Sequence, residues 1–115
     1  MESNRQKKIA RLIQKDLSEI FLKETKSIYH GFMISITHVF VSKDLSNAKI
    51  YLSIFPKKTK DQLFSLIQQR KGLIRHQLSL RMKNQTRKTP ALFFYIDNSI
   101  EHYETIDKIL KENQT

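Results

Sequence analysis

The chain has 115 residues, 39% of them hydrophobic, with two Gly, two Pro and no Cys. That length fits one domain with a single core, and the low Gly and Pro content leaves little room for linkers. The absence of Cys excludes disulfides and thiolate metal sites. No stretch approaches the roughly 18 apolar residues of a membrane-spanning helix, and the polar, basic N-terminus lacks the apolar part of a secretory signal. We therefore expect a soluble, cytoplasmic monomer.

The net charge of +10 is unevenly distributed. Residues 27–97 hold twelve Lys and Arg against three Asp and Glu, whereas residues 98–115 hold two against four. Residues 62–96 contain no acidic residue, and a folded segment of this kind repels itself unless a polyanion supplies negative charge. The pattern indicates nucleic acid, with a solvated cationic surface as the alternative. The seven cations of this segment are Arg70, Lys71, Arg75, Arg81, Lys83, Arg87 and Lys88.

The first half of the chain predicts one helix and two strands. Apolar residues at helical spacing indicate an amphipathic helix over residues 4–24. Residues 32–41 are rich in β-branched and aromatic residues and predict a strand, whose apolar set changes phase near Thr37–His38 and so indicates a bulge. After a turn, residues 48–55 alternate between apolar and other side chains, which predicts a second strand antiparallel to the first.

The second half predicts two helices, a strand and a short final helix. Thr59 and Gln62 have the spacing of a capping box that opens a helix, and a break at Lys71–Gly72 separates this helix from the next. Residues 91–96 predict a third strand, and Tyr103–Lys111 a final weak helix. The residues expected to be buried in the two middle helices are Leu63, Leu66, Ile67, Leu73, Ile74, Leu78 and Met82.

This order predicts an α+β fold, in which the third strand returns through a helical crossover and runs parallel to the second. The expected architecture is a type II KH-like domain: helix, strand, strand, helix, kink, helix, strand. A three-stranded mixed sheet would carry its helices on one face. We expect residues 1–115 to form this single domain, with a core over about residues 5–98 and a C-terminal helical tail over about residues 100–115.

Three segments resemble bacterial ribosome-binding factor A. Residues 41–53 (VSKDLSNAKIYLS) match that family's turn between the first two strands, where Ser, Asp-Leu and Ala-Lys recur. Residues 71–78 (KGLIRHQL) match its Gly-hydrophobic-Ile-Arg helix start. Residues 89–102 (TPALFFYIDNSIEH) match its Thr-Pro, aromatic strand and Asp-x-Ser-Ile ending. With the first helix, the resemblance covers about residues 5–110.

The resemblance implies a non-enzymatic assembly factor with no catalytic residue, cofactor or metal. Such a protein binds the immature small (30S) ribosomal subunit, contacts its 16S rRNA and the precursor of that RNA, assists maturation of the rRNA 5′ end, and matters most in the cold. The alternative is a protein–protein adaptor in ribosome biogenesis, whose basic face meets an acidic partner such as a ribosomal protein or an assembly GTPase. A nuclease is a third class, against which the four His argue because they lack paired ligand spacing.

We expect the seven cations of residues 62–96 to contact RNA phosphates, and Arg75 also recurs in the motif that the resemblance rests on. Four further cations either extend this RNA-binding surface or form solvated surface; they are Arg5, Lys8, Arg11 and Lys43. Asp44 is expected to form a turn rather than to act as a catalytic acid.

KH domains clamp a nucleic-acid backbone with a GXXG loop between two helices. That junction has a single Gly72 here, which we interpret as a structural kink rather than a clamp, so recognition is expected from charge and shape over folded RNA. Arg70 stands where the family's Ala-x-Gly kink has Ala, and Ser27-Ile28-Tyr29 stand where the family usually has Asp-Pro-Arg. Phe93 and Tyr95 alternate with core positions, and we expect them to pack against the C-terminal helix, with stacking on bases as the alternative.

Overall fold

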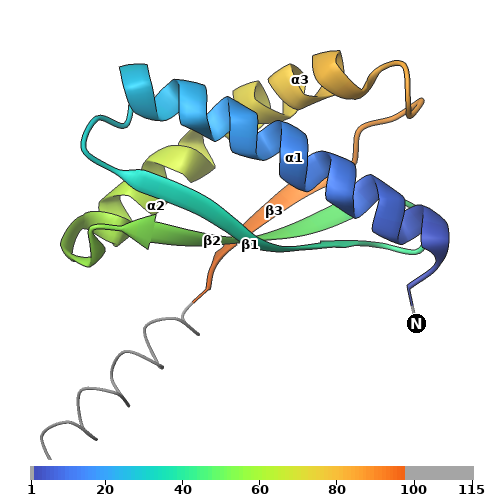
Figure 1. The fold of residues 1–115 in the computed structure, drawn as a ribbon, viewed down its shortest axis with the longest axis horizontal. Coiled ribbons are helices and arrows are strands. Elements are labelled where there is room, and N and C mark those ends of the chain that lie inside the picture. Colours follow the sequence, from blue (N-terminus) through green and yellow to red (C-terminus); the bar gives the residue numbers. More distant parts are fainter. Residues whose placement is uncertain (1, 98–115) are drawn as a thin grey trace, which may run out of the picture.

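A computed structural model describes residues 2–97, and the predicted helix at Tyr103–Lys111 lies outside that range. The elements follow the predicted order (Figure 1). They are α1 (Asn4–Ser27), β1 (Met33–Val41), β2 (Asn47–Phe55), the short 3-10 helix η1 (Lys57–Thr59), α2 (Lys60–Gln69), α3 (Lys71–Met82) and β3 (Ala91–Ile96).

Helix α1 begins at a capping box that the sequence analysis did not identify. The Ser3 hydroxyl accepts a hydrogen bond from the Gln6 backbone N–H, and the Gln6 side chain accepts one from the Ser3 N–H. These two bonds satisfy donors that a helix start otherwise leaves unpaired. The Ser-x-x-Gln spacing was visible in the sequence. The helix also continues to Ser27, beyond the predicted end at residue 24.

The sheet has the order β1-β2-β3 and is mixed, as predicted. Strands β1 and β2 are antiparallel, with a register shift between Ile36 and His38 that confirms the bulge. The extra residue, Thr37, turns its hydroxyl to the Asp97 carboxylate, 2.6 Å from Oδ2. Strand β3 pairs parallel to β2, and the helices that connect them lie on the same face of the sheet as α1 (Figure 1).

Three local predictions in the α2–α3 region were wrong. The helix break centres on Arg70, whose φ and ψ of −92° and 6° end α2 and begin α3. Gly72 instead lies inside the first turn of α3 and does not adopt a positive φ, so it is not the bend. Thr59 precedes α2, but its side chain makes no capping hydrogen bond. Leu73, expected in the core, is 47% exposed because the helix starts at Lys71 and turns this position outward.

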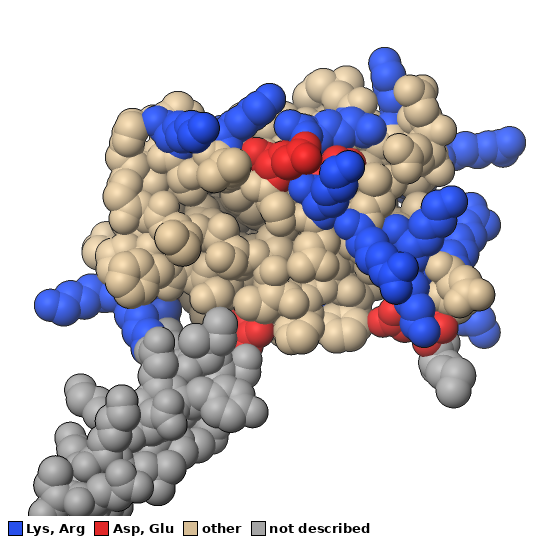
Figure 2. Space-filling model, viewed as in Figure 1, with Lys and Arg blue, Asp and Glu red and all other residues tan. Residues whose placement is uncertain are grey.

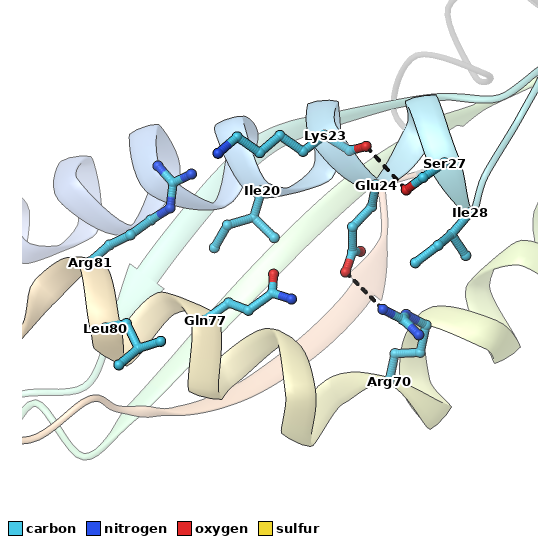
Figure 3. Close-up of a pocket in the computed structure, with 9 residues that line it drawn as sticks. All are labelled: Ile20, Lys23, Glu24, Ser27, Ile28, Arg70, Gln77, Leu80 and Arg81. Carbon is cyan, nitrogen blue, oxygen red and sulfur yellow. Dashed lines mark hydrogen bonds and ion pairs between the residues drawn. The ribbon is translucent and has the colours of Figure 1, made fainter.

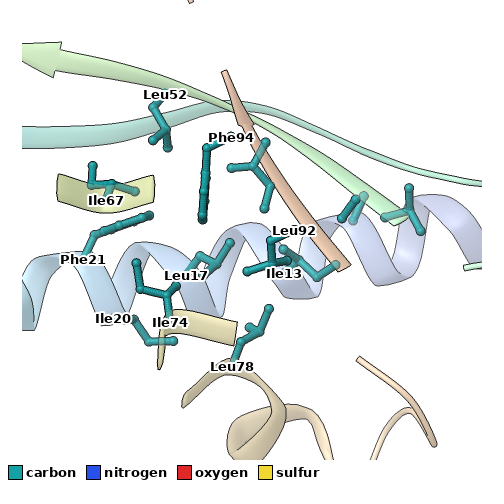
Figure 4. Close-up of a cluster of buried hydrophobic side chains, with 14 of the residues drawn as sticks. Ile13, Leu17, Ile20, Phe21, Leu52, Ile67, Ile74, Leu78, Leu92 and Phe94 are labelled. Atoms are coloured by element: carbon teal, nitrogen blue, oxygen red, sulfur yellow. The ribbon is translucent and has the colours of Figure 1, made fainter. Parts of the chain in front are cut away.

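The core fills the space between the helices and one face of the sheet (Figure 4). Ile13, Leu17 and Phe21 of α1 belong to this cluster, and the Phe21 ring packs edge to face on Phe94 of β3 with 6.1 Å between the ring centres. The predicted core positions Leu63, Ile67, Ile74, Leu78 and Met82 are buried on the inner sides of α2 and α3, whereas Leu66 is only partly buried. The opposite face of the sheet carries no helix among the described residues.

Candidate nucleic-acid interface

Three segments that are distant in sequence meet at one end of the sheet. Gln6, in the first turn of α1, donates a buried hydrogen bond to the carbonyl of Val41, the last residue of β1 (2.9 Å). Ala91, the first residue of β3, donates its N–H to the Ser46 carbonyl in the turn between β1 and β2 (2.8 Å). The N-terminal end of α1, this turn and the segment 83–90 therefore lie together.

Eight cations project into solvent from these three segments, Lys7 among them, and we call the seven that the sequence analysis named as site residues the basic end. Figure 2 shows Lys and Arg side chains gathered on the right, where Figure 1 places the start of α1 and the segment after α3. Because the side chains are exposed, a phosphate backbone can approach them without burying charge. The basic end comprises Arg5, Lys8, Arg11, Lys43, Lys83, Arg87 and Lys88.

The segment 83–90 is anchored by Arg75 of α3. The Arg75 guanidinium donates to the backbone carbonyls of Thr89 (2.6 Å from Nη2) and Pro90 (3.1 Å from Nε). Beside this anchor, α3 and the segment enclose a hollow of about 370 Å³, lined in part by Lys83, Arg87, Lys88 and Arg75. Arg75 thus shapes the basic end, and its guanidinium is engaged with the chain itself.

Arg70 also has a partner within the protein. Its Nη2 donates to Oε1 of Glu24 in α1 at 3.1 Å, beside a pocket of about 480 Å³ between α1 and α3 (Figure 3). Glu24 is 5% exposed. The hydrogen bond that Arg70 donates to Glu24 raises the pKa of its guanidinium. Burial, and after it the negative charge of Glu24, raises the pKa of Tyr29 to about 12.

Two more of the seven cations that were predicted to contact RNA, Arg81 and Lys71, have partners within the protein. Arg81 forms an ion pair with Glu19 of α1. Lys71 places its ammonium 5.0 Å from the centre of the Phe93 ring. The structure therefore brings only Lys83, Arg87 and Lys88 of the predicted seven together with the four additional cations. Residues 62–96 contain no acidic residue, and the carboxylates that pair with Arg70 and Arg81 come from α1. No local sequence pattern indicates pairing over that distance.

Asp44 lies at the basic end as a turn residue, as its sequence context indicated. Its Oδ1 accepts hydrogen bonds from the Ser42 hydroxyl (2.8 Å), the Ser46 hydroxyl (2.6 Å) and the Ser46 N–H (3.1 Å). These bonds lower the pKa of Asp44 to about 2, and the bond from the Ser46 side chain has the largest effect. A carboxylate held ionised by three donors is unsuited to proton transfer near neutral pH.

Within residues 2–97, no three His, Cys, Asp or Glu side chains approach closely enough to hold a metal ion. No helix in this range is long and apolar enough to cross a membrane. The chemistry that the site offers is the binding of anions by exposed ammonium and guanidinium groups.

Comparison with known proteins gives a family. The model of the ribosome-binding factor A family matches residues 5–110. Ribosome-binding factor A of Flavobacterium psychrophilum is 45% identical over 98% of this chain and 89% of its own length. The crystal structure of ribosome-binding factor A from Thermus thermophilus matches with a TM-score of 0.63 at 18% identity, over 79% of this chain and 94% of that chain.

A second solved structure is a homology model of the Thermus thermophilus factor, fitted into a cryo-EM map of its complex with 30S. It matches with a TM-score of 0.59 at 19% identity, over 76% of this chain and 89% of that chain. These two likenesses confirm the fold, and the family model together with the Flavobacterium relative establishes the family. The chain belongs to the ribosome-binding factor A family.

Proposed function

We propose that this chain is a small-subunit assembly factor, which binds the immature 30S subunit and its 16S rRNA and assists maturation of the rRNA 5′ end. Family membership supports this proposal, as does the Thermus thermophilus relative fitted into a 30S complex. The observation that carries it is the basic end, where seven exposed cations from three separate segments converge. An assembly factor of this kind would act in the cytoplasm, where ribosomes are built.

The proposed mechanism is binding without catalysis. The protein would favour one conformation of the rRNA by its greater affinity for that conformation, which is all that a ligand needs to shift an equilibrium. Lys83, Arg87 and Lys88 on the anchored segment and Arg5, Lys8 and Arg11 on α1 present charge from two directions, as a folded RNA surface would require. Arg70, Arg75 and Arg81 support the fold that holds these side chains.

Co-sedimentation with purified immature small subunits tests the proposal. The triple variant Lys83→Glu, Arg87→Glu, Lys88→Glu should lose association, because each change replaces attraction to phosphate with repulsion. A matched control reverses three exposed cations at the other end of the fold: Lys23→Glu, Lys26→Glu and Lys58→Glu. This variant has the same net charge and should still co-sediment.

Two results would contradict the proposal. If the native chain does not co-sediment, the assigned function is wrong. If both triple variants lose association equally, the basic end is not the site. Nucleotide-resolution crosslinking in cells separates RNA binding from the adaptor role, because an adaptor would crosslink to protein alone.

A further inference from the structure

The face of the sheet that lies away from the helices carries a row of aromatic side chains across all three strands. Tyr51 of β2 pairs with His38 of β1 on one side and with Tyr95 of β3 on the other. The Tyr51 and Tyr95 rings stack with 5.3 Å between centres and 26° between planes. The His38 ring meets Tyr51 edge to face at 6.5 Å. Strand pairing therefore sets three rings side by side.

A second row continues this surface with a cation at its middle. Lys49 of β2 pairs with Phe40 of β1 and with Phe93 of β3. The Phe40 ring packs against Tyr51 of the first row, edge to face at 6.0 Å. Lys71 reaches round the β3 edge from α3, to 5.0 Å from the centre of the Phe93 ring. We call the two rows the aromatic face: His38, Phe40, Lys49, Tyr51, Phe93 and Tyr95.

Four of these rings are open to solvent. Phe40 is 46% exposed, Phe93 40% and Tyr95 41%, and the His38 side chain is 61% exposed. Aromatic rings left in water lose the free energy that burial would release, and a contiguous exposed group of them marks an interaction surface. Ring–ring contacts also hold these side chains in place, so a ligand would need to order little on binding.

We propose that the aromatic face binds unpaired nucleotides of RNA, with bases stacked on its rings and phosphates near Lys49 and Lys71. The inference rests on the proposed function and extends it, since it assigns a contact with single-stranded RNA beside the contact of the basic end with folded RNA. Every base has a face that can stack on an aromatic ring, so this binding tolerates many sequences.

Charge favours RNA over an apolar protein surface as the occupant. Lys49 stands between two Phe rings, where an apolar partner would have to bury an ammonium group, whereas a phosphate would pair with it. Lys71 adds a second cation at the edge. The carboxylate at the border, Asp97, accepts a hydrogen bond from Thr37 and lies 3.9 Å from the His38 ring nitrogen, so its charge is turned toward the protein.

The test compares two strands with equal charge. Fluorescence anisotropy would measure the affinity of the full chain for a single-stranded octa-adenylate and for an abasic strand of the same length, over a series of salt concentrations. The octa-adenylate should bind at least about tenfold more tightly, and Phe93→Ser with Tyr95→Ser should remove that difference. Each ring lost should weaken binding by about 5- to 150-fold, the range typical of base stacking.

Matched variants separate stacking from general surface effects. Phe93→Tyr with Tyr95→Phe keeps both rings and should keep the affinity. Leu22→Ser with Leu80→Ser removes exposed apolar side chains of α1 and α3 and should also keep it. Stacking involves no counterion release, so the ring variants should leave the salt slope unchanged. The chain has no Trp, so quenching of Tyr emission by the octa-adenylate is a further readout.

Equal affinity for the two strands would overturn the inference, as would a loss of affinity in the Leu variant as large as in the ring variant. The double variant Ile106→Ser, Leu110→Ser tests a competing occupant of the aromatic face. If only this variant prefers the octa-adenylate, the inference is overturned in favour of the chain's own C-terminal segment as the occupant. Co-sedimentation of the native chain with small subunits, measured in parallel, keeps the proposed function separate: it can succeed while the strands bind equally.

Discussion

Arg70, at the break between α2 and α3, forms an ion pair with Glu24 near the end of α1, with 3.1 Å between Nη2 and Oε1. The two residues are 46 positions apart in the sequence. The pair ties the helix break to α1 and gives a buried carboxylate its counter-charge. The Arg70 side chain is therefore used inside the fold.

We expect Arg70→Met to destabilise the protein rather than to act on RNA binding alone. It leaves Glu24 buried without its partner, which should lower the free energy of unfolding by about 3 kcal/mol. Urea denaturation measures this. The double variant Glu24→Leu, Arg70→Met should recover most of the loss. Arg81→Met is the matched control and should cost at most about 1 kcal/mol, since the side chain of its partner Glu19 is 50% exposed. Equal losses for the two single variants would contradict a structural role for Arg70.

Tyr29 should make the protein less stable at high pH. Its pKa is raised to about 12 in the folded state, whereas an unfolded chain releases this proton near pH 10. The folded state therefore holds the proton longer, and the stability that this contributes is present below pH 10 and lost between about pH 10 and 12. Urea denaturation at several pH values should show a steeper fall for the native chain than for Tyr29→Phe, by at most about 3 kcal/mol. Parallel curves would refute the assignment.

Arg75→Lys should weaken the fold although it conserves charge. Lysine has no planar guanidinium with which to reach the Thr89 and Pro90 carbonyls together, so we expect a loss of about 1.5–3 kcal/mol in the free energy of unfolding. Lys88→Gln, on the same segment, removes an exposed cation and should leave stability within about 0.5 kcal/mol. A variant Arg75→Lys of native stability but weak subunit affinity would instead identify Arg75 as the RNA contact that its sequence motif indicated.

The salt dependence of subunit binding should report the cations of the basic end. Neutralising Lys83, Arg87 and Lys88 to Gln removes three phosphate contacts, so the slope of log affinity against log salt should become shallower by about 2 to 3. The control Lys23→Gln, Lys26→Gln, Lys58→Gln should leave the slope unchanged. A filter-binding series at four or five salt concentrations suffices. An unchanged slope in the first variant would remove these residues from the interface.

Most of the fold was predictable because its signals are local. The alternation of Ala48, Ile50, Leu52 and Ile54 identified β2, and the change of apolar phase at Thr37 located the bulge. The helix break was predicted one or two residues late, since Gly72 drew the prediction while the backbone turns at Arg70. A residue that fits a helix interior poorly in general can still lie in one, because tertiary contacts decide where the helix ends.

The sequence by itself determined the element order, the mixed sheet, the core pattern and the excess of positive charge. These follow from periodicity and composition, which act over a few residues. Only the tertiary structure decided which cations face solvent. It paired Arg70 and Arg81 with carboxylates of α1 and bound the Arg75 guanidinium to two backbone carbonyls. It also brought the exposed cations of three segments to one end of the sheet: Lys83, Arg87 and Lys88 with Arg5, Lys8, Arg11 and Lys43. Ion pairs form between groups that the fold brings within a few ångströms, whatever their separation along the chain.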